Sequence, residues 1–549
     1  DEAYDYFYKA CWNAAWQDAG YYSLAQLSAS KGNWEDALYE IDKSLLRNWH
    51  NLRGRHLKTV VLRHLGRVDE ALDLIRESLA IDCFNFGCSF EEYLLTGEKA
   101  VLDDLLVRMR SEGHNYEELS LDYASAGCWE EALKVVEVAF EVVASERTLL
   151  YYYKSWFLLS LGRLKEAEMA ICVAEHQSAD CCFPNALEAI KALQEVIRFA
   201  DVVPKAHYYL GNLWYDKRQY PEAIAEWEKS VEQDDTFPTV LRNLSLAYFN
   251  KLNKQQEAVV LLERAFKLDI RDARILMELD QLYKRLNRPH ADRLDLLDKL
   301  KEVAFSRDDL YLEYVTLLNQ LGRYEEAIRM IDPRRFHPWE GGEGKVPAQY
   351  QLARVELVKA CLKAGENEKA LDLIEECFIY PHNLGEGKLY GAQENDFNYY
   401  KGCALQALGR EAEARELFLA ASIGNSQPAA AMYYNDQKPD KIFYQGLALR
   451  KLGREDEARG CFNRLIDFGE KHLFDIFKMD YFAVSLPDLQ IWEDDMDKKN
   501  RIHCNYLMGL GHLGLGNLDK AERYFHIAAG MDNNHQGVQI HLKMVGNLI

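Results

Sequence analysis

The stretch HYYLGNLWYDKRQYPEAIAEWEKSVEQD (residues 207–234) places a small residue, Gly211, twelve positions before an alanine, Ala223. The same spacing returns along the chain, where the small residues are Ala25, Thr59, Ser120, Ser155, Gly211, Gly402, Gly446 and Gly509. A glycine also stands five positions before the alanine in the pairs Gly32/Ala37, Gly66/Ala71, Gly127/Ala132, Gly162/Ala167, Gly322/Ala327, Gly365/Ala370, Gly409/Ala414, Gly453/Ala458 and Gly516/Ala521. Several alanines are separated by 34 residues, as are Ala3, Ala37 and Ala71. This period, with apolar helical spacing on both sides of a glycine turn, predicts stacked helix hairpins.

Close approach of the two helices explains the small residues. Antiparallel helices joined by a short turn need small side chains where their backbones cross, and larger apolar residues then fill the seam to the next hairpin. We therefore expect an all-α fold, a right-handed α-α superhelical solenoid of about 13 helix hairpins.

These residues resemble the tetratricopeptide repeat (TPR) family. Residues 207–234 and YYSLAQLSASKGNWEDALYEIDKSLL (residues 21–46) are the clearest instances, and the resemblance covers nearly the whole chain. It implies a scaffold that binds a protein or peptide, but it names no partner, because one fold serves many functions.

Composition excludes several classes of protein. The net charge of −22 repels nucleic acid, and no apolar run reaches the roughly 20 residues that span a bilayer. The 12 cysteines show no CxxC pair and no zinc spacing, so we expect no metal, no cofactor and a reducing, cytoplasmic compartment. We find no activated nucleophile or other catalytic set, so the chain is interpreted as a non-enzyme.

Departures from the period suggest three segments. Residues 1–174 hold N-terminal units whose first repeat is truncated, which indicates further sequence upstream. Residues 175–305 hold central units with an extra helix, and residues 306–549 hold units with long loops and a closing helix. Residues 470–500 read as partly loop, with Asp494, Asp495 and Asp497 exposed.

Two long loops repeat one motif. Residues 338–345 read PWEGGEGK and residues 381–388 read PHNLGEGK, each copy following the second helix of its unit. Loops repeated on one edge often form a binding surface. The predicted ligand-binding residues are His337, Trp339, Glu340, Glu343, His382, Asn383, Glu386, Glu394 and Asp396. Carboxylates beside an aromatic platform suit a polyhydroxylated ligand, a cationic group or a divalent metal, and the alternative is that the loops are hydrogen-bonded turns that widen the superhelix.

Aromatic residues recur where a first helix is expected to face the concave groove. With two asparagines, the predicted groove residues are Tyr22, Tyr152, Trp156, Tyr208, Asn212, Tyr215, Asn243, Tyr399, Phe443 and Tyr506. They would form a stacking-rich channel for a peptide, and the asparagines would reach its backbone. The alternative is that the rings pack against the adjacent helix or that a loop fills the groove.

A narrower resemblance joins phrases such as WNAAWQDAGYYSLAQ and MDYFAVSLPDLQIWEDD to a bacterial family of unassigned function. In that family an N-terminal β-sandwich similar to aldose epimerases precedes a TPR array, which implies a link to carbohydrate. Two hypotheses follow. The first is a scaffold that holds a peptide or the protein's own upstream domain. The second is a carbohydrate-binding or carbohydrate-processing protein whose loops at residues 337–346 and 380–397 help to enclose a sugar.

Overall fold

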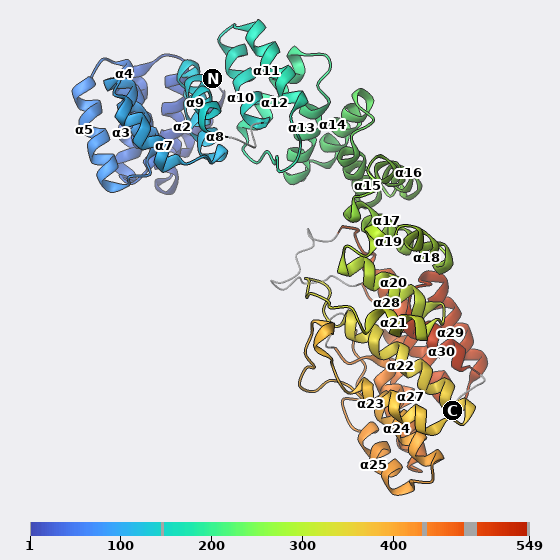
Figure 1. The fold of residues 1–549 in the computed structure, drawn as a ribbon. Helices are drawn as coiled ribbons and strands as arrows, with labels where there is room; N and C mark the ends of the chain where they lie inside the picture. Colours follow the sequence, from blue (N-terminus) through green and yellow to red (C-terminus); the bar gives the residue numbers. More distant parts are fainter. Residues whose placement is uncertain (1, 144–147, 431–435, 477–490, 546–549) are drawn as a thin grey trace. The chain divides into compact units, whose positions relative to one another are not determined.

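The computed structural model describes residues 2–143, 148–430, 436–476 and 491–545 (Figure 1), and the regular structure in these ranges is helical throughout. The chain divides into two compact units, Asp1–Leu244 and Ser245–Ile549. Each unit is a series of helix hairpins, so the expectation of an all-α solenoid is confirmed.

The first unit begins with a short helix and continues in pairs. Its helices are α1 (Glu2–Ala10), the 3-10 turn η1 (Ala14–Trp16), α2 (Gln17–Ser30), α3 (Trp34–Arg47), α4 (Leu52–His64), α5 (Val68–Ile81), α6 (Phe86–Thr96), α7 (Lys99–Met109), α8 (Gly113–Ser125), α9 (Trp129–Val142), α10 (Thr148–Ser160), α11 (Leu164–His176), α12 (Glu188–Phe199), α13 (Pro204–Asp216) and α14 (Tyr220–Gln233). The extra helix expected after residue 175 is α12, which stands between two hairpins.

Helix α15 (Pro238–Leu252) begins in the first unit and ends in the second. The second unit continues with α16 (Gln255–Leu268), α17 (Ala273–Arg285), α18 (His290–Lys299), α19 (Lys301–Ala304), α20 (Asp308–Gln320), α21 (Tyr324–Ile331), α22 (Lys345–Ala364), α23 (Asn367–Cys377), the 3-10 turn η2 (His382–Leu384), α24 (Asn395–Ala407), α25 (Glu411–Ala421), α26 (Pro439–Lys451), α27 (Glu455–His472), α28 (Met496–Gly514), α29 (Leu518–Met531) and α30 (Gln536–Met544). None of the helices in the described ranges has both the length and the apolar character needed to cross a bilayer.

The glycine that stands five positions before each repeat alanine turns the chain from the first helix of a hairpin to the second. All nine of these glycines have a positive φ, as at Gly32 (φ 76°) and Gly322 (φ 75°). At the first of them, Gly32 N–H donates to Ala29 O and Asn33 N–H donates to Ser28 O. This is the left-handed ending of an α-helix that glycine adopts without a steric penalty. Where the glycine is missing, the same place holds Arg218, Asn253 or Asn287, also at positive φ.

The small residue twelve positions before the alanine makes room for a side chain of the second helix. A Cβ added at Gly402 would lie 2.7 Å from Cε1 of Phe418, and one added at Gly446 would lie 2.4 Å from Cε1 of Phe462. Gly211 and Gly509 meet aromatic rings in the same way. In each case the ring belongs to the residue sixteen positions after the glycine, so these hairpins close on a glycine–aromatic pair.

In hairpins that have alanine, threonine or serine in place of this glycine, the second helix carries an aliphatic side chain in place of the aromatic ring. Ala25 and Thr59 are followed sixteen residues later by Ile41 and Ile75, both fully buried. Ser120 and Ser155 are followed in the same way by Val136 and Ile171. The volume at each crossing is thus shared between the two helices, as dense interior packing requires.

The second unit closes on itself through its last hairpin. In Figure 1 the red helices α28–α30 lie beside α20–α22, and hydrogen bonds join them. Arg293 is fully buried and donates to Asp280 (2.7 and 2.9 Å), Glu313 (2.7 Å) and Asn534 Oδ1 (2.9 Å). Because Asn534 lies between α29 and α30, the end of the unit supplies the last partner of a buried guanidinium.

The chain just before α28 also packs into this unit. Trp492 is 2% exposed, and its indole N–H donates to Glu278 O at 3.1 Å. The expectation that Asp494 is exposed is wrong, since it pairs with Arg285 and its side chain is 10% exposed. Asp495 and Asp497 are exposed as expected, and residues 477–490 of the same stretch lie outside the described residues.

The crossing pairs predict a rescue experiment. Gly402→Ala should lower the free energy of unfolding by about 1–3 kcal/mol, because its Cβ would overlap the ring of Phe418. Adding Phe418→Ile recreates the combination found at Ala25 and Ile41, so the double variant should recover part of the loss. Gly460→Ala, within α27 and with only an ordinary contact to Arg464 at 3.4 Å, is the control.

Denaturant titration of the four proteins measures the coupling between the two sites. Strictly additive losses from Gly402→Ala and Phe418→Ile would contradict the shared-volume explanation.

Candidate functional site

The two GEGK loops lie against each other on the second unit. Phe336 N–H donates to Asn383 O at 2.8 Å, and Gly344 N–H donates to Glu386 Oε2 at 2.7 Å. The side-chain amide of Asn383 donates to the carbonyls of Ile331, Asp332 and Arg334. The sequence expectation that these loops are neighbours is therefore met, and Asn383 acts as a clamp between them.

A hollow of about 260 Å³ opens between these loops, and we call it the loop hollow. Five of the predicted ligand-binding residues line it, together with Leu384 and Val346: His337, Trp339, Glu340, Glu343 and Glu386. Burial raises the pKa of Glu386, the nearby Glu343 carboxylate adds to this effect, and the hydrogen bond from Gly344 opposes it. The hollow therefore combines an indole ring with several carboxylates.

The two identical tetrapeptides adopt different conformations. In the first copy Gly344 has φ 71° and precedes the first residue of α22, whereas in the second copy Gly385 has φ 76° and ends η2. Glu343 is exposed, while Glu386 accepts the hydrogen bond from Gly344. The repeated sequence thus serves two roles, and one copy supports the other.

The other predicted loop residues lie outside the loop hollow. His382 is exposed, and Glu394 forms an ion pair with Lys388. Asp396 is buried and forms an ion pair with Lys441 on α26. Asp396 instead lines a second cavity of the same unit.

Most of the predicted groove aromatics are packed between helices. Six of them are at most 6% exposed: Tyr152, Trp156, Tyr208, Tyr399, Phe443 and Tyr506. Tyr152 OH donates to Glu175 at 2.6 Å, and Trp156 meets Trp129 edge to face with ring centroids 5.3 Å apart. This is the packing arrangement that the sequence left open as the alternative to an open channel.

The remaining groove residues are half-buried. Asn243 Nδ2 donates to Asn212 Oδ1 at 3.0 Å, and the indole N–H of Trp227 donates to the same oxygen at 3.1 Å. The ring of Tyr215 lies 5.3 Å from that of Trp227. The two predicted asparagines are thus neighbours on adjacent first helices, but they are bonded to each other.

A cavity of about 380 Å³ opens between helices of the second unit, and we call it the inner cavity. Side chains of α22, α24, α26, α28 and α30 line it, including Glu356, Asp396, Tyr444, Tyr506 and His541. Two of these, Asp396 and Tyr506, were predicted separately as a loop residue and a groove residue. The solenoid brings them to one site because the unit closes on itself.

Two histidines at the inner cavity each have one ring nitrogen that can accept a hydrogen bond. His541 Nδ1 lies 2.7 Å from Gly537 O and His503 Nε2 lies 2.8 Å from Ala429 O, so each of these nitrogens carries the donated proton. His541 Nε2 is buried, and none of the residues that the structure describes forms a hydrogen bond with it. Burial lowers the pKa of both residues to about 4, which keeps them neutral at physiological pH.

Charged groups lie beside these imidazoles. The Lys441 ammonium pairs with the buried Asp396 carboxylate and lies 3.9 Å from Asp440. Lys438 and Glu356 complete the charged lining, and Phe397 adds an aromatic face. The inner cavity thus contains three carboxylates and two ammonium groups.

The first unit has a polar hollow of its own, of about 300 Å³. Tyr22, Arg53, Glu118, Asp122 and Glu188 line it. Arg53 pairs with Glu118 at 2.5 Å and with Asp122 at 3.3 Å. Burial raises the pKa of Asp122 to about 7, against the lowering effect of Arg53.

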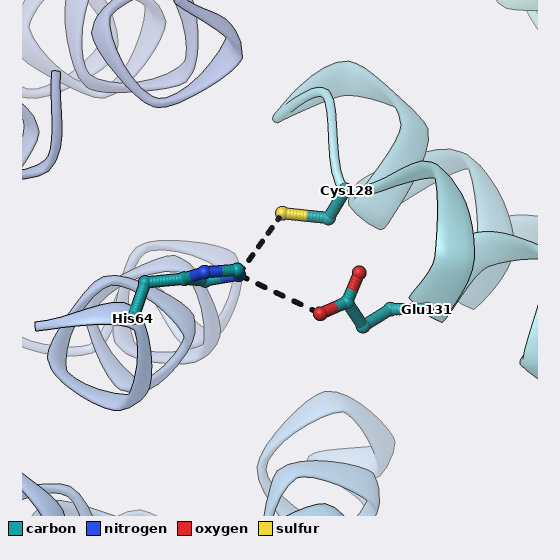
Figure 2. A group of neighbouring side chains, drawn as sticks. All are labelled: His64, Cys128 and Glu131. Carbon is teal, nitrogen blue, oxygen red and sulfur yellow. Dashed lines mark hydrogen bonds and ion pairs between the residues drawn. The ribbon is translucent and has the colours of Figure 1, made fainter. Parts of the chain in front are cut away.

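A cluster of metal-type donor atoms also lies in the first unit. His64, Cys128 and Glu131 offer one donor atom each, and all three atoms lie within 4.8 Å of one another (Figure 2). His64 is the last residue of α4, Cys128 immediately precedes α9 and Glu131 lies in the first turn of α9, so 64 residues separate the histidine from the cysteine. The sequence offered no zinc spacing here, since only the Cys128–Glu131 interval is local.

The inner cavity was missed from the sequence for a related reason. His503 lies on α28, His535 immediately precedes α30 and His541 lies on α30, while Asp396 and Asp440 stand between 63 and 145 residues earlier in the chain. Their meeting depends on how far the hairpins curve, and no single unit records this. The sequence feature that could have indicated the cavity is the presence of polar residues on α24, α26 and α30 that the structure buries, such as Asp396, Lys441 and His541.

Comparison with known proteins supports the repeat type. The tetratricopeptide repeat model matches residues 204–237, the unit formed by α13 and α14. A tetratricopeptide repeat protein from Parabacteroides merdae is 16% identical, with 56% of this chain and 100% of that chain covered and a TM-score of 0.26. The TPR protein YrrB, described as having an unusual peptide-binding site, is 15% identical, with 43% and 94% covered and a TM-score of 0.17.

A third similar structure is a chain of the APC/C hetero-tetramer Cut9–Hcn1. It is 12% identical, with 95% of the present chain and 95% of that chain covered and a TM-score of 0.25. At scores of this size, the three structures do not bear on what the present chain binds.

The neutral imidazoles predict a pH dependence of stability. Below about pH 6.5 an unfolded chain protonates its histidines, whereas His541 in the folded chain stays neutral down to about pH 4. Its contribution to stability is therefore lost as the pH falls from about 6.5 to about 4, at up to about 1.4 kcal/mol per pH unit.

His541→Gln should flatten this slope in urea titrations at several pH values between about 4 and 6.5. His526→Gln, at an exposed site on α29, is the control and should leave the slope unchanged. Equal slopes for wild type and His541→Gln would contradict the neutral, buried state of His541.

Proposed function

We propose that this chain is a non-catalytic scaffold that holds a segment of polypeptide, and that a lysine or arginine side chain of that segment enters the inner cavity. The observation that carries this proposal is the buried His541 Nε2, an acceptor to which none of the described residues donates, in a residue that lines a cavity together with Asp440 and Glu356. A buried acceptor is costly when unpaired, so a donor-rich side chain stabilises the site by entering it.

The chemistry of the lining favours a cation. A guanidinium offers five N–H donors and an ammonium offers three, while neither accepts a hydrogen bond. His541 Nε2, His503 Nδ1 and the Asp440 carboxylate are acceptors around one cavity. Tyr444, Tyr506 and Phe397 supply ring faces and edges, and a cation over an aromatic face gains further stabilisation.

The size and charge of the molecule agree with this reading. A volume of about 380 Å³ lies at the lower end of ordinary ligand pockets, which suits a side chain and its flanking backbone. The net charge of −22 attracts a cationic partner and raises its rate of encounter. One side chain in the inner cavity, with the flanking residues on the rim, would therefore define the register of a bound segment.

Asp440→Asn tests this proposal. The probes are fluorescein-labelled peptides with one central arginine or lysine among glycine, serine and tyrosine, and matched peptides with citrulline or acetyl-lysine instead. We expect fluorescence polarisation to show binding of the charged peptides and a loss of about tenfold or more in affinity for Asp440→Asn, because a charge-assisted bond is worth about 1.5–3 kcal/mol.

Asp456→Asn, exposed on α27, is the control because it removes the same charge from the chain without touching the cavity. Equal affinity for charged and uncharged peptides, or equal effects of the two substitutions, would contradict the proposal.

The loop hollow supports a second candidate function, the binding of a carbohydrate. The observation that favours it is the meeting of Trp339, Glu343 and Glu386 around one hollow. Carboxylates accept hydroxyl hydrogen bonds, while an indole covers the apolar face of a sugar ring. This ligand would sit at the outer loops rather than in the inner cavity.

A panel of mono- and oligosaccharides, screened by thermal shift, tests the second candidate. We expect at least one sugar to raise the melting temperature of the wild-type chain, and Glu343→Gln/Glu386→Gln to abolish the shift. Glu368→Ala/Glu416→Ala, at exposed sites on α23 and α25, should keep it. A shift that survives in the loop variant would refute this site, and no shift with any sugar would refute the function.

A further inference from the structure

We propose that His64 Nε2, Cys128 Sγ and a carboxylate oxygen of Glu131 form a site for a divalent transition-metal ion, with zinc as the ion that this donor set fits and water as the fourth ligand. The three residues meet in the first unit, whereas the loop hollow and the inner cavity belong to the second unit. The inference therefore stands independently of the proposed peptide and sugar sites.

The spacing of the donor atoms supports this assignment. His64 Nε2 lies 3.9 Å from Cys128 Sγ and 3.5 Å from Glu131 Oε1, as the dashed lines in Figure 2 show. In a tetrahedral zinc site, with bonds of about 2.0–2.3 Å, donor atoms are separated by roughly 3.3–3.6 Å. The two distances from His64 Nε2 are within a few tenths of an ångström of this range, and all three donor atoms lie within 4.8 Å of one another.

The same distances are long for hydrogen bonds between the side chains. A nitrogen–oxygen hydrogen bond is usually about 2.7–3.2 Å, so the 3.5 Å contact is weak. Cys128 and Glu131 therefore lie near the His64 nitrogen without a short hydrogen bond to it.

The surrounding residues hold the donors in place. The His64 ring is stacked on Trp34, with centroids 4.0 Å apart and an angle of 4° between the planes. Arg63 donates to Glu131 Oε1 at 2.8 Å. A carboxylate has about four lone-pair sites, so Glu131 can accept the hydrogen bond from Arg63 and bind a metal ion at the same time. Fixed orientation of this kind raises the affinity of a metal site.

The charges balance when an ion binds. A thiol binds a metal ion as the thiolate, so the Cys128 S–H proton must leave when the ion binds. Binding breaks the S–H bond, releases that proton to water and forms a metal–sulfur bond, as metal–thiolate sites require. The thiolate and Glu131 then neutralise the two charges of the ion, while Arg63 keeps its pair with Glu91 at 2.7 Å.

The position of the site suggests its role. His64 lies at the end of α4, and Cys128 lies in the turn between α8 and α9. This turn also packs on α2, since a Cβ at Gly127 would lie 2.8 Å from Ser30 Cα. An ion here would link hairpins that are far apart in sequence and stabilise the curvature of the first unit.

Cobalt titration of the full, untagged chain tests the proposal after treatment with EDTA and desalting. Cobalt(II) bound by a thiolate gives a near-ultraviolet charge-transfer band, which zinc should then displace. We expect the wild type to bind about one ion per chain, Cys128→Ser to lose the band, and His64→Gln to bind roughly tenfold or more weakly. No thiolate band in the wild type, or an unchanged band in Cys128→Ser, would overturn the proposal.

A matched control is present on α11. Cys172 Sγ lies 3.9 Å from His176 Nδ1, the same separation as in the proposed site, but among the residues that the structure describes these two have no third donor beside them. Cys172→Ser should therefore keep the full cobalt band.

Thermal unfolding gives a second readout that does not depend on the spectrum. Zinc should raise the melting temperature of the wild type and of Cys172→Ser, but not that of Cys128→Ser. An equal rise in all three proteins would overturn the proposal.

Discussion

The contact between a small residue and a larger apolar side chain at the hairpin crossings sets the geometry on which the other features depend. Where the first helix carries Gly402 or Gly446, the second helix places Phe418 or Phe462 against its backbone. Where the first helix carries Ala25, the partner is the smaller Ile41. This exchange of volume keeps the two helices close in every unit, and the stacked first helices then present their inward faces to the cavities. A change at a crossing would therefore alter the shape of a cavity that it does not touch.

Much of this geometry could be predicted from the sequence, because it is local. The glycines at the turns have positive φ, and the long loops follow the second helices and meet, as their spacing indicated. The conformations of the two GEGK copies could not be predicted, because they depend on a hydrogen bond between the copies. Gly344 of the first copy donates to Glu386 of the second, and Glu343 does not accept this bond. Identical tetrapeptides thus differ because of a contact between them. The donor atoms of His64 and Cys128 are brought together by curvature, which a pattern within one unit does not record.

Burial of the histidines connects the stability of the second unit to its chemistry. His541 and His503 are neutral because they are buried, and neutrality is what leaves each imidazole with a free lone pair. Protonation would convert both acceptors into donors and place positive charge beside Lys441. The same desolvation that costs stability at acidic pH therefore preserves the acceptor character of the inner cavity near neutrality.

The closure of the second unit around Arg293 has an evolutionary consequence. Repeat proteins commonly gain or lose units at their ends, because each unit contacts only its neighbours. Here Asn534 and Gln536 bond to Arg293 and Gln349, which lie nearly 200 residues or more earlier in the chain. Inserting or deleting one hairpin between them would shift these partners out of reach and leave a guanidinium in the interior without its amide oxygen. The number of hairpins in this stretch is therefore constrained like the circumference of a ring, whereas an open array could change its length freely.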